Sequence, residues 1–182
     1  YFYLPGKILH IDGDNEYLNR CLKYYEDVNI WAMGITEKEE NIASKIKDLL
    51  EEYNPDIVVI TGHDGMIRRN TRYNDIYNYR NSRHFIETVK EARKYDKKRN
   101  KNLVIFAGAC QSYFEAIISA GANFASSPAR ILIDFLDPLI VAEKIATTEN
   151  YKYITIDDIA GELRDGKKGI SGIGANGKLK YE

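Results

Sequence analysis

Two residues with reactive side chains, His63 and Cys110, each follow directly after an apolar stretch of the sequence. His63 lies in residues 57–65, IVVITGHDG, and Cys110 lies in residues 103–112, LVIFAGACQS. An imidazole beside a thiol can take up its proton, and the resulting thiolate is the nucleophile of cysteine hydrolases. If the two stretches form neighbouring parallel strands, both side chains lie at the carboxyl edge of one sheet, where open α/β folds place their sites.

The backbone near these residues could complete an acyl-transfer site. We expect Cys110 to open a helix, whose dipole favours the anionic thiolate. The backbone N–H of Cys110, together with one from Asp64 or Gly65, could form an oxyanion hole that stabilises a tetrahedral intermediate. Small residues around the pair, Gly62 and Gly108 among them, would let a substrate backbone approach.

Each of the two reactive residues has a simpler explanation when it is taken alone. A cysteine after a buried strand is often a small core residue, and a single histidine is often a polar group with satisfied hydrogen bonds. Their joint occurrence at two predicted strand ends, each with glycine nearby, favours a catalytic pair. Packing explains Cys21 on an amphipathic helix, His10 inside a strand and His84 in another helix.

Predicted strands and helices alternate along the first two thirds of the chain. Residues 6–12 predict a buried strand, after which Asp14 caps a helix. Thr36 and Glu39 predict a capping box for a helix that reaches about Tyr53. The other elements predicted here are strands at residues 29–35, 56–62 and 103–107, a helix at 81–95, and the helix that Cys110 opens.

Beyond Gly121 the pattern predicts smaller elements. Asp137 and Pro138 are placed at the N-cap and first position of a helix, where the missing N–H of proline is harmless. Asn176 and Gly177 carry a hairpin signal. These elements are a strand at 122–126, a helix at 137–147, a strand at 151–156 and the hairpin in the glycine-rich tail 166–181.

This alternation predicts an α/β fold of three layers, with a mostly parallel sheet and helices on both faces. Numbered along the chain, the strands are expected in the order 2-1-3-4, which makes strands three and four neighbours. Their carboxyl ends then lie about 5 Å apart, which would bring His63 and Cys110 together. With 182 residues, 44% of them hydrophobic, the chain predicts one soluble domain, 1–182.

Composition limits the compartment and the partners. A net charge of −1 gives no general attraction to nucleic acid or to a membrane. Two cysteines do not make a disulfide framework, which favours a reducing compartment. The sequence begins at Tyr1 without a methionine and shows no signal peptide, so we expect a fragment of a longer protein that is not secreted by such a signal.

Longer stretches of the sequence resemble a known family. An apolar block followed by histidine, and another followed by Ala-Cys, resemble the clan of caspases, legumains, clostripains and gingipains. Within this clan the chain resembles the YabG family of sporulation-specific peptidases of spore-forming Firmicutes, over about residues 6–173. The stretches that carry the resemblance are LHIDGDNEYL at 9–18, NPDIVVITGHDG at 54–65, NYRNSRHFIETVKEAR at 78–93 and LVIFAGACQSYFEAIISAGANFASSPARI at 103–131.

The resemblance implies a caspase-like fold and a cysteine endopeptidase that uses His63 and Cys110 and cleaves after arginine. Its expected partners are spore coat and cortex-associated proteins, and its expected location is the cytoplasm of the sporulating cell, in association with the spore coat. It implies neither a metal nor an organic cofactor, and it implies an N-terminal region that this chain lacks. The clan pattern places glycine directly after the histidine, whereas Asp64 stands there and Gly65 follows, so we favour the N–H of Gly65 as the second oxyanion donor.

A preference for arginine requires a carboxylate in the pocket, because a guanidinium binds best to a bidentate partner. In the clan, the end of the first strand contributes to this pocket, and here it carries Asp12 and Asp14. We prefer Asp12, because Asp14 is also expected to cap a helix. Gln111 and Ser112, next to the nucleophile, are expected to line the same pocket.

Residues 68–101 are rich in arginine and lysine. A solvated surface explains this better than a site for a polyanion. In a peptidase that cleaves after arginine, the loop between Gly65 and Asn81 would also be a target for the enzyme itself.

Two other classes of protein share parts of this pattern. Residues 7–14 and 55–65 resemble a phosphorelay receiver domain, in which an aspartate at the end of strand three accepts phosphate. Thr61 and Gly62 occupy that position here, which removes the chemistry. A glutamine amidotransferase also pairs a cysteine with a histidine, but its histidine follows the cysteine in sequence, whereas His63 precedes Cys110.

Overall fold

A central sheet of six strands organises the protein, whose computed structural model describes residues 2–181. The first five strands run parallel, and the sixth, at the edge, is antiparallel to its neighbour. The spatial order is β3 (Ala32–Thr36), β2 (Ile8–Asp12), β4 (Ile57–Ile60), β5 (Val104–Ala107), β6 (Phe124–Ser126) and β8 (Ile170–Gly172).

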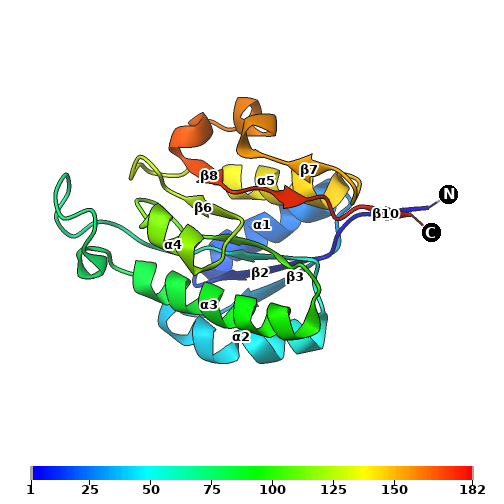
Figure 1. The fold of residues 1–182 in the computed structure, drawn as a ribbon, viewed down its shortest axis with the longest axis horizontal. Coiled ribbons are helices and arrows are strands. Elements are labelled where there is room, and N and C mark those ends of the chain that lie inside the picture. The colour runs from blue at the N-terminus through cyan, green and yellow to red at the C-terminus, as the bar shows by residue number, and fades with distance from the viewer. Residues whose placement is uncertain (1, 182) are drawn as a thin grey trace.

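Helices cover both faces of the sheet and give the molecule three layers (Figure 1). One face carries α1 (Asn15–Asp27) and α5 (Asp137–Thr147). The opposite face carries α2 (Glu39–Tyr53), α3 (Ser82–Arg99) and the short α4 (Phe114–Ala120). The predicted α/β class, with a mostly parallel sheet between two helical layers, is confirmed, and so is the predicted order of the first four strands, 2-1-3-4.

The side chains of each strand alternate between the two faces of the sheet and so contribute to the hydrophobic core on each face. In β2, Ile8 packs with α1 and α5, whereas Leu9 and Ile11 pack with α2 and α3, because successive side chains of a strand point to opposite faces. All five residues of β2 are buried, which makes it a central strand. This burial fixes the register of the sheet, since a slip by one residue would exchange the two cores.

Short elements close the molecule at the periphery. The 3-10 helices are η1 (Ile76–Asn78), η2 (Ile156–Asp158), η3 (Ala160–Glu162) and η4 (Gly166–Lys168). Two further pairs of strands are β1 (Tyr3–Leu4) with β10 (Lys180–Tyr181), and β7 (Tyr153–Ile154) with β9 (Ala175–Asn176). The pair β1 and β10 brings the two ends of the chain together (Figure 1).

The structure corrects two predicted helix starts on the site side of the sheet. The predicted capping box at the start of α2 is absent, because Thr36 still belongs to β3 and the carboxylate of Glu39 binds the backbone N–H of His63 instead. Cys110 does not open a helix either, because it lies in a turn and α4 begins at Phe114. The expected support of the thiolate by a helix dipole is therefore wrong.

Two predictions in the last third of the chain also need correction. Asp137 is the first residue of α5 rather than its N-cap, since Leu136 already has helical φ and ψ of −77° and −24°. Asn176 pairs with Tyr153 in β7, and Gly177 does not form a hairpin turn. A Cβ at Gly177 would lie 2.1 Å from the backbone oxygen of Thr148, so a close backbone approach explains this glycine.

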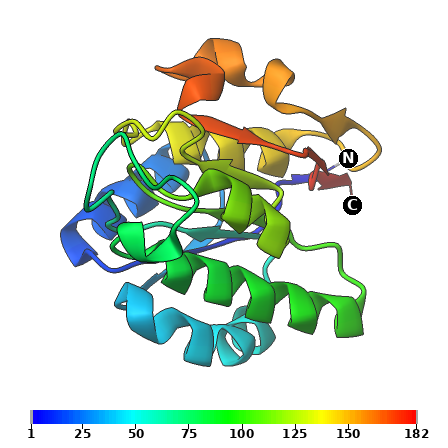
Figure 2. The ribbon, with the colours of Figure 1, turned by 60° about the vertical axis from the view of Figure 1, so that its left-hand side comes forward.

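The loops that follow the parallel strands gather at one edge of the sheet. Figure 2 turns this edge toward the viewer and shows the long loop after β4 projecting beside it. A bridge between Met66 and Tyr79 closes the base of that loop. None of the helices in residues 2–181 combines the length and the apolar character needed to span a membrane.

Candidate active site

His63 and Cys110 occupy equivalent positions beyond two adjacent parallel strands. Ile60 of β4 is the register partner of Ala107 of β5, and each reactive residue lies three residues beyond its member of that pair. The N–H of Gly108 donates to the backbone oxygen of Ile60 at 3.0 Å, which extends the pairing past the end of the strands. The strand order therefore brings the two residues to the same part of the carboxyl edge.

Direct contacts between the two loops strengthen this placement. The hydroxyl of Ser112 donates to Oδ2 of Asp64 at 2.7 Å, and the N–H of Met66 donates to Oε1 of Gln111 at 3.1 Å. These contacts join residues that lie within three positions of His63 to residues that lie within two positions of Cys110.

Asp64 is the centre of the hydrogen-bond network beneath the site. Its Oδ1 accepts the N–H groups of Gly65 and Asn81, both at 2.8 Å. Its Oδ2 accepts the hydroxyls of Ser82 and Ser112 at 2.5 and 2.7 Å. Both carboxylate oxygens are committed to these four donors, so the side chain of Asp64 orders the loops and does not orient the imidazole.

The imidazole of His63 is open to solvent, and its partner is Asp14. The His63 side chain is 76% exposed, and its Nε2 lies 3.6 Å from Oδ2 of Asp14. Asp14 caps α1 as predicted, since its Oδ1 accepts the N–H of Tyr17 at 3.0 Å. This N–H is the main cause that lowers the pKa of Asp14, and the charge of His63 lowers it further. The carboxylate therefore stays ionised beside the imidazole.

Cys110 is partly exposed and is held in a tight turn. The N–H of Ile133 donates to its Sγ at 3.2 Å, which fixes the position of the sulfur. Gln111 takes the left-handed conformation, with φ of 58°, and its N–H donates to the oxygen of Ile131 at 3.0 Å. The segment around residues 131–133 thus forms one wall beside the thiol.

Cys21 offers a contrast within the same chain. It lies on the buried face of α1 and is fully buried in the core, and burial raises the pKa of its thiol to about 12. Such a thiol is inert at neutral pH. Of the two free cysteines, Cys110 is therefore the one that can react with a molecule in solution.

The backbone donors around Cys110 differ in their availability. The N–H of Gly65, which the sequence favoured as an oxyanion donor, already donates to Oδ1 of Asp64. Within residues 2–181, no acceptor lies within hydrogen-bond distance of the N–H of Asp64 or of Cys110. These two groups are free to bind an oxyanion.

Asp12 is buried, with 1% of its surface exposed. Its Oδ1 accepts the N–H of Asp14 at 2.8 Å, and its Oδ2 accepts the hydroxyl of Thr61 at 2.5 Å. Burial is the main cause that raises the pKa of Asp12, against the effect of these hydrogen bonds. A guanidinium could reach Asp12 only after displacing these partners.

A chain of buried polar groups continues from Thr61 through the sheet. Because the Thr61 proton is donated to Asp12, its oxygen accepts the Nε2–H of His10 at 2.7 Å. Nδ1 of His10 then accepts the hydroxyl of Tyr25 at 2.8 Å. Complete burial lowers the pKa of His10 to about 3, so the ring stays neutral in this tautomer.

Glu39 is a residue of the site that the sequence reasoning assigned to another role. It is 8% exposed, and its Oε2 accepts the N–H of His63 at 2.7 Å. The carboxylate fits between two glycines, since a Cβ at Gly62 would lie 2.4 Å from Oε2 and one at Gly13 would lie 3.0 Å from Oε1. The sequence signal for this role of Glu39 was a glycine after each of two adjacent strands, because glycine leaves room for a side chain from another segment.

The two residues after Cys110 have different surroundings. Ser112 is fully buried, and its hydroxyl donates to Asp64 and accepts the N–H of Ala109 at 2.9 Å. Gln111 is half-buried and uses its Oε1 to hold Met66. This placement tells against contact between Ser112 and a substrate and leaves Gln111 at the rim. In the described part of the chain, no three His, Cys, Asp or Glu side chains converge as metal ligands would.

The comparison with known families decides the relationship. All residues, 1–182, match the family model described as YabG peptidase U57. The chain belongs to this family. It is 44% identical over 180 residues to the sporulation-specific protease YabG of Bacillus subtilis (strain 168), an alignment that includes 99% of this chain and 62% of that protein. The chain thus spans about three fifths of the length of the curated relative that it matches.

A solved structure is also similar over part of the chain. A GDP-L-fucose synthetase from Naegleria fowleri superposes with a TM-score of 0.34 and 9% identity, covering 59% of this chain and 32% of that one. A likeness this low says nothing about the site. Family membership supports neither the receiver nor the amidotransferase alternative.

In this member of the YabG peptidase family, Arg130 joins loops around Cys110. Its guanidinium donates to both carboxylate oxygens of Glu115, at 3.0 and 2.6 Å, and to the hydroxyl of Tyr79 at 2.8 Å. It also lies 5.5–5.9 Å from the ring centroids of Tyr73, Tyr79 and Tyr113. Nothing in the spacing along the sequence indicated this contact, because its partners come from two separate segments, the loop between β4 and α3 and the start of α4.

Proposed function

We propose that this chain is a single peptidase domain, a cysteine endopeptidase that cleaves after arginine and acts on spore coat and cortex-associated proteins. The observation that carries the proposal is the placement of His63 and Cys110 at equivalent positions beyond adjacent parallel strands, in a chain of the YabG peptidase family. The arginine preference and the substrates come from the resemblance of the sequence to that family.

The proposed reaction follows the chemistry of a thiol and an imidazole. The Cys110 thiol loses its proton to His63, and the sulfur attacks the carbonyl carbon of the scissile bond. The C–N bond breaks as His63 returns the proton to the leaving amine. Water then attacks the thioester, its proton passes to His63 and back to the sulfur, and the acid is released. Asp14 holds the imidazole through the contact of 3.6 Å with Nε2, so Nδ1 remains for the proton transfer.

Free backbone donors support a role in stabilising the oxyanion. The N–H groups of Cys110 and Asp64 are proposed to hold the negatively charged oxygen of the tetrahedral intermediate. The fixed loop geometry around Asp64 favours this, because donors that are already in place need no reorganisation during the reaction. We propose Asp64 in place of Gly65, whose N–H is occupied.

The preference for arginine is proposed to rest on carboxylates between β2 and β4. Glu39 and Asp14 both lie beside His63, and the Asp14 side chain is 40% exposed. Oε1 of Glu39 has no hydrogen-bond donor within the described residues, so it can accept a guanidinium N–H. Asp12 lies behind them with both oxygens bound, and it adds negative potential to the same region.

Turnover of short fluorogenic peptides with arginine or aspartate at the cleaved position tests the proposal. We expect kcat/KM for the arginine peptide to fall to background in Cys110→Ala and His63→Ala, and to hold in the buried control Cys21→Ala. Glu39→Gln and Asp14→Asn should reduce the arginine preference more than Asp12→Asn does. Activity that persists in Cys110→Ala would refute the proposed nucleophile, and an unchanged preference in all three carboxylate variants would refute the pocket.

A further inference from the structure

A second concave surface lies at the opposite edge of the sheet from His63 and Cys110. It has a volume of about 920 Å³ and is formed by the segments that precede β5 and β6, the end of α3 and the extended segment 173–180. We call it the amino-edge groove, and it is lined among others by Lys97, Asn123, Asn150, Asn176, Lys178 and Lys180. A groove of this size can enclose a segment of a ligand.

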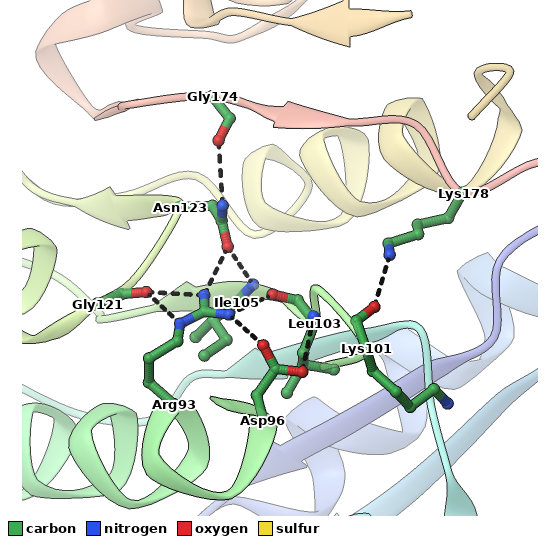
Figure 3. A network of polar contacts seen from close by, with 9 residues as sticks. All are labelled: Arg93, Asp96, Lys101, Leu103, Ile105, Gly121, Asn123, Gly174 and Lys178. Atoms are coloured by element: carbon green, nitrogen blue, oxygen red, sulfur yellow. Dashed lines mark hydrogen bonds and ion pairs between the residues drawn. The ribbon is translucent and has the colours of Figure 1, made fainter. Parts of the chain in front are cut away.

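Hydrogen bonds join the walls of the amino-edge groove (Figure 3). Arg93 on α3 donates to Oδ1 of Asn123 at 2.9 Å and to the oxygen of Gly121 at 2.8 Å. Nδ2 of Asn123 donates to the oxygen of Gly174 at 3.1 Å, and its Oδ1 also accepts the N–H of Ile105 at 2.9 Å. One amide thus connects α3, β5 and the C-terminal segment, which holds the groove in a fixed shape.

The charged residues that line the amino-edge groove are positively charged. Lys97, Lys178 and Lys180 line it together with Arg93, and none of the aspartates or glutamates in residues 2–181 does so. The two buried carboxylates nearby are already bound. Asp96 accepts Arg93 at 2.9 Å and the N–H of Leu103 at 3.0 Å.

Asp56, the second of these carboxylates, accepts the N–H of Lys7 at 2.8 Å and Nζ of Lys180 at 3.2 Å. Within residues 2–181, neither Lys97 nor Lys178 forms an ion pair. The Nζ of Lys178 donates to the backbone oxygen of Lys101 at 3.5 Å. Two ammonium groups therefore remain without a carboxylate.

Burial lowers the pKa of Lys178, and the neighbouring charges of Lys180 and Lys101 lower it further, against the opposing effect of Asp56. The groove therefore holds positive charges that repel one another. A bound anion would relieve this repulsion, because opposite charges favour the ionised form of a lysine.

The polar lining indicates what kind of anion fits. Amide side chains of Asn102, Asn123, Asn150 and Asn176 stand among the lysines, and amides can bind both N–H and C=O groups of a peptide backbone. Single-stranded nucleic acid needs aromatic rings for stacking. Among the described residues, Tyr153 is the one aromatic residue of the lining, and its hydroxyl donates to the oxygen of Ile173.

We propose that the amino-edge groove binds an acidic segment of polypeptide, rich in glutamate or aspartate, at a distance from the catalytic edge. The proposal does not depend on the proposed peptidase activity, because it concerns binding alone.

Binding of a fluorescein-labelled peptide of alternating glutamate and glycine, measured by fluorescence anisotropy with the Cys110→Ala protein, tests the proposal. We expect saturable binding that weakens with added salt. The double change Lys97→Glu and Lys178→Glu should weaken it at least about tenfold. The control pair Lys47→Glu and Lys90→Glu, which alters the net charge equally on exposed helix positions, should leave it within about twofold.

Three results would overturn the proposal. The first is equal affinity of both double variants. The second is tighter binding of a labelled oligothymidylate than of the acidic peptide by the parent protein. The third is release of the peptide by inorganic phosphate when sodium chloride at the same ionic strength does not release it. That result would identify a site for small anions. Circular dichroism of each variant excludes unfolding as the cause, and Lys97→Gln with Lys178→Gln replaces any pair that fails to fold.

Discussion

At the scale of single residues, burial changes the acid–base chemistry of His10. It is fully buried, and its pKa is lowered to about 3 by burial. In the unfolded chain the same imidazole takes up a proton below about pH 6.5. The unfolded state therefore binds more protons than the folded state between these two values, and stability falls as the pH is lowered through this window.

We predict that the free energy of unfolding decreases between about pH 7 and pH 5 with a slope of up to about 1.4 kcal/mol per pH unit from His10. Urea denaturation at a series of pH values measures this slope. In His10→Gln the slope should become flatter, whatever the absolute stability of the variant. His84→Gln, at a half-buried helix position, serves as the control for the loss of an imidazole elsewhere in the fold. Parallel slopes in His10→Gln and the parent would contradict this account.

The residues that the sequence placed correctly are those whose role depends on strand ends. Apolar runs in the sequence predicted the positions of His63 and Cys110, and a helix-capping position predicted that of Asp14. The roles of Asp64 and Glu39 could not be predicted. Asp64 binds Asn81 and Ser112, which lie 17 and 48 positions away, and Glu39 binds His63, which lies 24 positions away. A carboxylate that accepts backbone N–H groups from another segment leaves no local pattern.

At the scale of elements, the glycines after β2 and β4 decide how α2 meets the sheet. A Cβ at Gly62 would lie 2.4 Å from Oε2 of Glu39, the atom that accepts the N–H of His63. Gly161 in η3 has nothing within 4 Å of such a Cβ and is therefore a matched control.

We predict that Gly62→Ala destabilises the fold by about 1–3 kcal/mol, because Glu39 must move out of a packed position. It should also lower kcat/KM for the arginine peptide, since the backbone of His63 loses its carboxylate partner. Gly161→Ala should change the stability by less than about 0.5 kcal/mol. Chemical denaturation and peptide turnover of both variants provide the comparison, and equal effects of the two substitutions would show that the space beside Glu39 is unimportant.

The loop between β4 and α3 is the element most exposed to the proposed activity. Arg68, Arg69 and Arg72 are exposed there, and Asn78 holds the loop through backbone contacts to Arg68 and Thr71. We predict slow cleavage after one of these arginines by another copy of the protein. Intact-mass spectrometry of purified parent and Cys110→Ala protein during storage would reveal it, and identical masses throughout would exclude it.

Some boundaries of helices and strands could be predicted from the sequence and others could not. Strands β2, β4 and β5 could be predicted from continuous apolar runs, as buried parallel strands require. The start of α4 could not, because the turn after Cys110 is made by a left-handed Gln111 and by contacts with residues 131–133. The pairing of Asn176 with β7 likewise depends on a partner that is distant in sequence.

At the scale of the whole molecule, the two edges of the sheet have different tasks in this account. The carboxyl edge carries His63 and Cys110, the proposed reactive pair, and the amino edge carries a cationic groove. The fold class and the order of the central strands followed from the alternation of strands and helices. The antiparallel strand β8 and the pairing of the chain ends could not be predicted in this way, because the elements of the C-terminal region are short and their hydrophobic periodicity is weak.

The rate at which a peptidyl arginyl chloromethyl ketone alkylates the protein tests the central claim, that the fold brings His63 and Cys110 together as a reactive pair. In this reaction the sulfur displaces chloride, and the mass of the peptide fragments identifies the labelled residue. The account predicts label on Cys110 and none on Cys21, with a rate at least about a hundredfold lower in His63→Ala and near the parent value in His84→Ala. Equal rates in His63→Ala and the parent, or label on a residue other than Cys110, would contradict it.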